Sequence, residues 1–238
     1  MRVGIIGAGN MGSAFARRLS AAGHEVSIAS RDVEGARKVA AAVGARVRAV
    51  PQERIADDVE VVIAATPYEH QADALRASGS LDGKTVVEIS NPVTEDMSGL
   101  AVGLTTSAAE EVAKSAPGAN VVKAFNTVFA QVLADAPSSG TKVQVFYASD
   151  DEGAKRTVRS LIESMAFEPL DAGPLSNARY LEPLGMLNIY LGYVAKLGTD
   201  IAPAVRKVAQ QTAPSRADQV ARPTTGAGRE SETRPTAS

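Results

Sequence analysis

The sequence predicts an α/β protein built on a doubly wound, mainly parallel β-sheet, with a small strand-helix appendage near its C-terminal end. Short apolar runs rich in Val and Ile alternate with stretches of helical periodicity, as in repeated strand-helix-strand units. The first unit also carries three glycines where its strand leads into its helix. We therefore expect one large domain, with ligands at the carboxyl ends of its strands.

The apolar runs predict six strands in the main domain. They lie at 2–6, 25–29, 59–64, 85–89, 120–124 and 143–148. A helix at 11–22 follows the first strand, and most of the later connections are long enough to be helical crossovers. Residues 1–150 are therefore assigned to this domain.

The appendage follows the sixth strand. Asp150 and Asp151 supply N-capping carboxylates for a helix at 152–165, and a short strand is expected at 167–171. Ser176 is expected to cap a last helix at 177–197, which is apolar nearly all round. Such a helix is either buried or forms half of an oligomer interface.

Residues 201–238 differ in composition from the rest of the chain. They carry Pro, Gly, Ser, Thr and charge with almost no large apolar residue. A segment of this kind buries too little surface to offset its ordering entropy, so we expect a disordered tail.

Composition excludes several classes of function. The chain has 25 basic and 27 acidic residues, so nucleic acid and anionic membranes are not expected as partners. It has no cysteine and two histidines, and no metal-ligand spacing is found. Without a signal peptide or a long apolar run, a cytoplasmic protein that binds a small molecule is expected.

The glycine motif Gly7, Gly9 and Gly12 has the spacing G-x-G-x-x-G between a predicted strand and a predicted helix. This context makes it a dinucleotide-binding fingerprint of the Rossmann fold. Gly7 permits the tight turn, Gly9 lets a pyrophosphate approach the backbone, and Gly12 lets helix and strand pack closely. The alternative is a turn that merely tolerates glycine.

Ser30 and Arg31 end the second strand, where an NAD-preferring site usually has Asp or Glu. Ser30 can donate a hydrogen bond to a 2'-phosphate, and Arg31 can pair with it and stack on the adenine. Asp32 must then point away, as a cap of the next helix. The pair predicts NADP(H) as cofactor, with a solvated Arg31 as the alternative.

Polar residues also end the third, fourth and fifth strands. Thr66 and Pro67 would lie beside the cofactor, while the amides of Asn91 and Asn126 could hold the carboxamide or a carbonyl of the acceptor. His70 and Asn126 are the candidates for a direct part in the reaction, although His70 is equally expected as a solvated residue at a helix start. For hydride transfer, the protein mainly has to bind and orient the cofactor and the acceptor.

Several segments together resemble the NADPH-dependent reductases of the deazaflavin coenzyme F-420. They are MRVGIIGAGNMG, SIASRD, VVIAATPYEH, VVKAFNTV and FEPLDAGPLSNARYLEPLGMLNIYL. The resemblance covers about residues 1–200, and its most specific part is LDAGPLSNAR at 170–179. It is accompanied by a weaker similarity to the N-terminal domains of pyrroline-5-carboxylate reductases and to the cytoplasmic domains of ferric reductases.

The resemblance implies a homodimer in which hydride passes between NADP(H) and a deazaflavin or flavin acceptor. It implies that residues 151–200 close the acceptor pocket, with 126–128 and 184–187 facing the acceptor. Carried onto matching positions, it assigns the pyrophosphate to Gly7, Gly9, Asn10 and Met11, the 2'-phosphate to Ser30 and Arg31, and the flank of the cofactor to Thr66 and Pro67. Two alternatives stay open, an imine or other small-molecule reductase and a non-catalytic NADP(H)-binding sensor.

Overall fold

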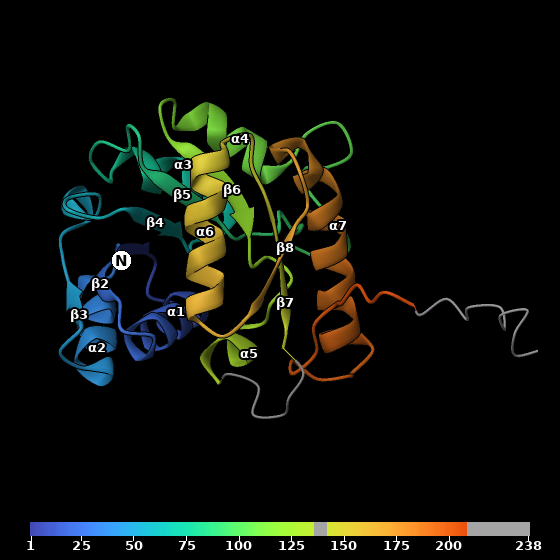
Figure 1. The fold of residues 1–238 in the computed structure, drawn as a ribbon, viewed down its shortest axis with the longest axis horizontal. Coiled ribbons are helices and arrows are strands. Elements are labelled where there is room, and N and C mark those ends of the chain that lie inside the picture. The colour runs from blue at the N-terminus through green and yellow to red at the C-terminus, as the bar shows by residue number, and fades with distance from the viewer. Residues whose placement is uncertain (136–141, 209–238) are drawn as a thin grey trace, which may run out of the picture. The chain divides into compact units, whose positions relative to one another are not determined.

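An eight-stranded sheet organises the chain in the computed structural model (Figure 1). Its order is β3-β2-β1-β4-β5-β6-β7-β8, and every neighbouring pair is parallel except β6 and β7. The strands are β1 (Arg2–Ile6), β2 (Glu25–Ala29), β3 (Val47–Ala49), β4 (Val61–Ala64), β5 (Thr85–Glu88), β6 (Asn120–Ala124), β7 (Gln144–Ala148) and β8 (Glu168–Asp171). The predicted doubly wound α/β fold is confirmed, because the first six strands have the Rossmann order.

The structure describes residues 1–135 and 142–208. Met1–Ala204 form one unit, and of the second unit, Val205–Ser238, the described residues 205–208 have no regular secondary structure. Most of the predicted tail at 201–238 thus lies outside the described residues. No helix in the described ranges is long and apolar enough to span a membrane.

Helices cover both faces of the sheet. They are α1 (Asn10–Ala21), α2 (Val33–Val43), α3 (Tyr68–Arg76), α4 (Ala108–Ser115), α5 (Ala130–Ala134), α6 (Glu152–Ser164) and α7 (Ala178–Ile189). Helices α1, α2, α5 and α6 pack in one apolar cluster with alternate strand residues such as Ile5 and Ile28. Helices α3 and α4 and the start of α7 pack on the opposite face. This alternation follows from the period-two side-chain pattern of buried strands.

The appendage forms largely as predicted. Asp151 caps α6 by accepting a 2.6 Å hydrogen bond from the Ala154 amide. The prediction that Ser176 caps the last helix is wrong, because Ser176 lies inside a 3-10 turn at Leu175–Asn177. That helix, α7, also ends earlier than expected and continues as a π-helical turn at Tyr190–Val194. Leu181 of α7 packs on Phe146 and Ala148 of β7, so α7 lies beside that strand (Figure 1).

Candidate functional site

The glycine loop between β1 and α1 is packed so tightly that two of its glycines are required. Gly7 has a φ of 112°, and a Cβ there would collide with the carbonyl oxygen of Ala65. A Cβ on Gly12 would collide with the carbonyl oxygen of Gly7. Around Gly9, in contrast, no described atom lies within 4 Å of an added Cβ. The loop therefore has an open face at the N-terminus of α1, where backbone amides favour an anion.

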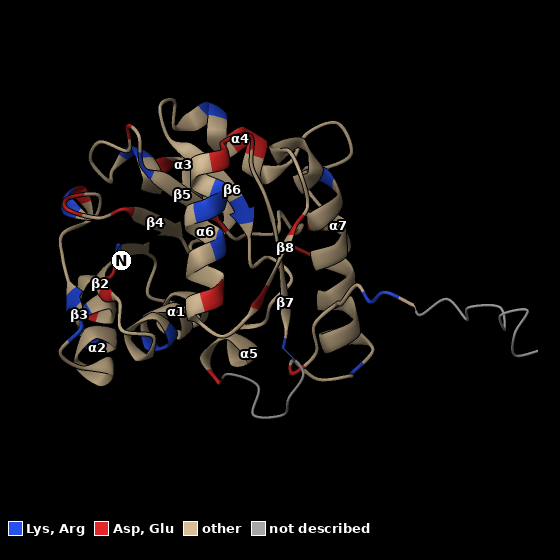
Figure 2. Cartoon of the chain, viewed as in Figure 1, with Lys and Arg blue, Asp and Glu red and all other residues tan. Residues whose placement is uncertain are grey.

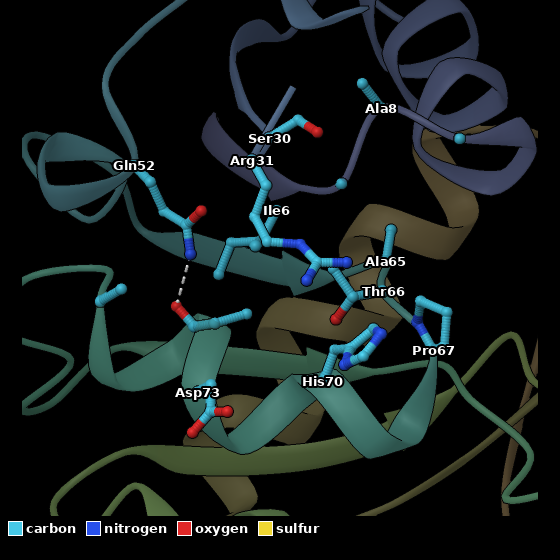
Figure 3. Close-up of a pocket in the computed structure, with 14 residues that line it drawn as sticks. Ile6, Ala8, Ser30, Arg31, Gln52, Ala65, Thr66, Pro67, His70 and Asp73 are labelled. Atoms are coloured by element: carbon cyan, nitrogen blue, oxygen red, sulfur yellow. Dashed lines mark hydrogen bonds between the residues drawn. The ribbon is translucent and has the colours of Figure 1, made fainter. Parts of the chain in front are cut away.

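A first cavity of about 410 Å³ opens beside this loop. Its walls include Gly7 and Gly9, the pair Ser30 and Arg31 at the end of β2, and His70 of α3. Figure 3 shows the Arg31 side chain reaching into the cavity toward His70. Among the described residues, the guanidinium of Arg31 has no hydrogen-bond or ion-pair partner, so it is available to a ligand.

Asp32 lies outside that cavity lining and occupies the N-cap position of α2, although its side chain accepts no capping hydrogen bond there. Its Oδ2 lies over the first turn, 2.7 Å from where a Cβ on Gly35 would stand. The carboxylate thus points toward α2, as the predicted preference for a 2'-phosphate requires.

A second cavity, of about 450 Å³, joins the first. The two share Gly9, Ala65, Thr66 and Pro67. The second cavity extends over the ends of β5 and β6 to α7, and its further lining is Asn10, Met11, Ile89, Ser90, Asn91, Phe125, Asn126, Thr127, Val128, Phe129, Ala130, Gly185, Asn188, Ile189 and Tyr193. A ligand of two parts can therefore lie along the carboxyl edge of the sheet with one part in each cavity.

Two asparagines join the loops of the second cavity to α7. Asn126 Nδ2 donates to Asn91 Oδ1 at 2.9 Å and to the carbonyl oxygen of Leu181 at 2.7 Å. Asn91 Nδ2 donates to the carbonyl oxygen of Asn126 at 2.8 Å. A Cβ on Gly185 would collide with Asn91 Oδ1, so the glycine lets α7 approach this pair.

Phe125 places Asn126 at the cavity wall. Its φ is 61°, in the left-handed region that non-glycine residues rarely adopt. The ring is buried between Phe15, at a centroid distance of 5.0 Å, and Phe167, at 6.4 Å, in edge-to-face packing. Aromatic packing thus holds a strained backbone at the turn that presents Asn126 and Thr127.

A buried ionic cluster lies behind the second cavity. Lys123 Nζ is 2.6 Å from Glu88 Oε2 and 2.8 Å from Glu182 Oε1, and all three side chains are fully buried. Glu182 also accepts hydrogen bonds from the amides of Ala108 and Ala109 at the start of α4. Burial raises the pKa of the Glu182 carboxyl, and the neighbouring Lys123 ammonium opposes that rise. The cluster ties α7 to β5, β6 and α4.

The structure brings most of the predicted residues together along the two cavities. Ser30 and Arg31 lie in the first, Asn10, Met11, Asn91 and Asn126 lie in the second, and Gly9, Thr66 and Pro67 line both. Gly7 lies in the first cavity and Gly12 packs beneath it. The two candidates for a direct part in the reaction are separated, because His70 lines the first cavity and Asn126 lines the second.

The wall that α7 contributes differs from the predicted one. Of the segment 184–187, Gly185 lines the second cavity, while Leu184 packs on the β7 cluster and Leu187 is exposed. Tyr68, at the start of α3, lines neither cavity, and burial together with nearby acids raises its pKa.

Sequence reasoning missed further lining residues and the ionic cluster. Gln52 and Asp73 line the first cavity, and Asn188, Ile189 and Tyr193 line the second. The sequence did contain one indication of the wall that α7 forms. Gly185 is a glycine within an apolar helix, and such a glycine indicates that another group approaches the helix closely.

The known proteins that this chain resembles are oxidoreductases. Residues 2–92 match the family model described as NADP oxidoreductase, coenzyme F420-dependent. The F420-dependent NADP reductase of Methanothermobacter marburgensis is 30% identical over 207 residues, which are 80% of this chain and 92% of the relative. Metalloreductase STEAP3 of Rattus norvegicus is 33% identical over 188 residues, which are 78% of this chain. The chain therefore spans only 37% of the length of that metalloreductase.

A solved structure agrees with these sequence matches. It is described as a putative F420-dependent NADP reductase from Arthrobacter sp. FB24, with a TM-score of 0.78 and 27% identity. The match covers 86% of this chain and 99% of that chain. The described fold is therefore shared over nearly the whole length of that protein.

Proposed function

Because the chain belongs to the family of F420-dependent NADP reductases, we propose that it transfers hydride between NADP(H) and a deazaflavin or flavin ring. The observation that carries the proposal is the pair of joined cavities. One has a glycine loop and an Arg31 that pairs with no described residue, and the other lies at the same strand edge beyond Thr66 and Pro67. The residues fit NADP(H), since Gly9 leaves open space where the backbone must approach the pyrophosphate.

The first cavity is assigned to the adenosine half of the cofactor. Ser30 and Arg31 would hold the 2'-phosphate, and the α1 amides at Asn10 and Met11 would hold the pyrophosphate. His70 faces Arg31 across this cavity, so we assign it to the adenosine end and not to proton transfer.

The second cavity is assigned to the nicotinamide and the acceptor ring. Bound NADPH supplies the hydride, and the acceptor ring accepts it. The protein positions both rings and excludes water through the apolar side chains of Met11, Phe129, Ile189 and Tyr193. Asn91 and Asn126 shape the inner wall of this cavity, and neither side chain transfers a proton in the proposed reaction.

Turnover assays with several acceptors test the proposal. Purified protein is mixed with NADPH and, separately, coenzyme F420, FMN, FAD and a cyclic imine, and nicotinamide absorbance is followed. We expect oxidation with the deazaflavin or a flavin and none with the imine. Tight NADPH binding without turnover of any acceptor would contradict the proposal and favour an NADP(H) sensor, while turnover of the imine would favour an imine reductase.

We also propose that two copies of the chain pair through α7 and the π-helical turn that follows it at Tyr190–Val194. Tyr180, Leu187, Tyr190 and Val194 are each at least half exposed, and Leu187, Tyr190 and Val194 are spaced three and four residues apart. Figure 2 shows that α7 carries little charge compared with α6. A stripe with this spacing suits packing against another helix, and the same stripe on a second copy meets the symmetry of a two-fold dimer.

A further inference from the structure

Four side-chain oxygens at the wall of the second cavity are buried without a hydrogen-bond partner in the described chain. They are Thr66 Oγ1, Ser90 Oγ, Asn126 Oδ1 and Thr127 Oγ1, and all four residues line that cavity. Buried polar atoms are normally paired, because leaving one unpaired costs its full desolvation. Four such atoms around one cavity, from the loops after β4, β5 and β6, indicate groups kept for a ligand.

The orientation of the Asn126 amide is determined by its neighbours. Both hydrogens of Nδ2 are used, one by the Leu181 carbonyl and one by Asn91 Oδ1. Asn91 cannot be turned over, since its own Nδ2 donates to the Asn126 carbonyl. An exchange of oxygen and nitrogen in either amide would therefore place an acceptor against an acceptor. Asn126 Oδ1 is consequently an acceptor without a partner in the described chain, on a residue that lines the cavity, and the amide has no hydrogen left to donate to a carbonyl.

The other three unpaired oxygens are hydroxyls. Those of Thr66, Ser90 and Thr127 can each donate a hydrogen. The lining residues thus carry one unpaired acceptor that cannot donate and three unpaired groups that can. A planar amide, in which an N–H stands next to a C=O, complements this arrangement.

We infer that the second cavity recognises the N–H of a planar amide group of its ligand, with Asn126 Oδ1 accepting from the N–H and the neighbouring hydroxyls donating to the adjoining carbonyl. The inference rests on the proposed function, which supplies two sources of this chemistry. One is the carboxamide of the nicotinamide, and the other is the lactam N–H on the pyrimidine edge of a deazaflavin or flavin. Asn126 is thereby a specificity residue and not an acid or base.

The nicotinamide source is tested by calorimetric binding to the unmodified protein. NADP+ is compared with its 3-acetylpyridine analogue, which replaces the amide NH2 by a methyl group of similar size. The thionicotinamide analogue is the matched control, because it keeps both N–H groups and changes the carbonyl. If the nicotinamide supplies the N–H, the acetylpyridine analogue binds about tenfold to a hundredfold more weakly, and the thio analogue keeps most of the affinity.

The acceptor source is tested with riboflavin and 3-methylriboflavin, whose ring N–H is blocked. Binding is measured by quenching of flavin fluorescence in the presence of NADP+. If the acceptor supplies the N–H, methylation weakens binding by a similar factor. A loss in either arm supports the inference and identifies the source, whereas losses below about twofold in both arms overturn it.

A variant tests the hydroxyl wall independently. Thr127→Val keeps the shape of the side chain and removes its hydroxyl, and Thr157→Val on α6, whose hydroxyl bonds the Gly153 carbonyl, is the control. We expect about tenfold weaker binding of NADP+ or riboflavin in Thr127→Val, with a melting temperature close to that of the control. Unchanged affinity for both ligands would overturn the role of the hydroxyls.

Failure of the proposed function has a different signature. If NADP+ itself does not bind, the cofactor assignment fails and the inference falls with it. If NADP+ binds and no acceptor is turned over, the acceptor assignment fails, and the comparison of NADP+ with its two analogues still decides the inference.

Discussion

Arg31 is the residue on which we propose that the choice of cofactor depends. The guanidinium reaches into the first cavity and has no partner among the described residues. In Arg31→Ala we expect the Kd for NADPH to rise about tenfold to a hundredfold, the effect of a lost charge-assisted hydrogen bond, with little change for NADH. Fluorescence titration with both cofactors measures this.

Arg37→Ala is the matched control for Arg31, because Arg37 pairs with Glu34 on the exposed side of α2. It should leave both affinities unchanged. An equal loss of NADPH and NADH binding in Arg31→Ala would refute the 2'-phosphate assignment.

His24 makes the stability of the fold depend on pH. It is buried, with Nε2 2.8 Å from the Ser164 hydroxyl and Nδ1 3.1 Å from the N-terminal nitrogen. Burial, followed by the N-terminal charge, lowers its pKa. The unfolded chain therefore binds a proton first, so this contribution is complete above an unfolded pKa of about 6.5 and is lost as the pH falls through that value toward the folded pKa.

Urea unfolding from pH 5 to 8 tests this dependence. The free energy of unfolding should fall with decreasing pH in the natural chain, and His24→Gln should flatten that slope. A slope that is the same in both proteins would assign the dependence to other groups.

At the scale of elements, the buried Glu88–Lys123–Glu182 cluster joins α7 to the sheet. Lys123→Met removes the cation and leaves two buried carboxylates together. We expect a loss of about 3–5 kcal/mol in the free energy of unfolding, as for other broken buried ion pairs. Chemical denaturation measures this loss.

Two comparisons sharpen that measurement. Lys114→Met breaks an exposed pair with Glu111 and should leave the free energy of unfolding nearly unchanged. Adding Glu88→Gln and Glu182→Gln to Lys123→Met should restore part of the loss, because the uncompensated charges are removed. No restoration would mean that packing, and not charge, holds this junction.

The exposed stripe of α7 predicts the oligomeric state. Leu187→Glu places a charge in the proposed helix pair and should convert a dimer to a monomer in light-scattering measurements. Val33→Glu, at an equally exposed apolar residue on α2, is the control and should leave the dimer intact. A natural chain that is monomeric at high concentration would exclude the pairing.

At the scale of the whole molecule, both cavities are lined by residues between Ile6 and Tyr193. Removing residues 209–238 should therefore leave NADP+ affinity and turnover unchanged. Calorimetry and acceptor assays on the shortened chain check this. A loss of NADP+ affinity or of turnover would show that the last thirty residues contribute to the site.

The fold could be predicted largely because buried strands appear as uninterrupted apolar runs. β3 could not, since this edge strand has only three residues, Arg48 interrupts it and Arg46 precedes it. The antiparallel direction of β7 was not predicted either, because an apolar run predicts burial and not strand direction.

The two halves of the site differ in the same way. The glycine loop and its strand are contiguous in sequence, so the part of the first cavity that they form could be predicted. The second cavity depends on the Asn126 bond to Leu181, which joins residues 55 positions apart and follows no local pattern.

Gly185 restricts which substitutions this pocket can accept during evolution. Because a side chain at 185 would occupy the space of the Asn91 amide, the glycine and the two asparagines cannot change independently. A homologue with a larger residue at 185 would have to replace Asn91, and Asn126 would then lose its hydrogen bond to the Asn91 side chain. Among family members, these three positions should therefore vary together, and they would separate descendants that keep this pocket from those that rebuilt it for another acceptor.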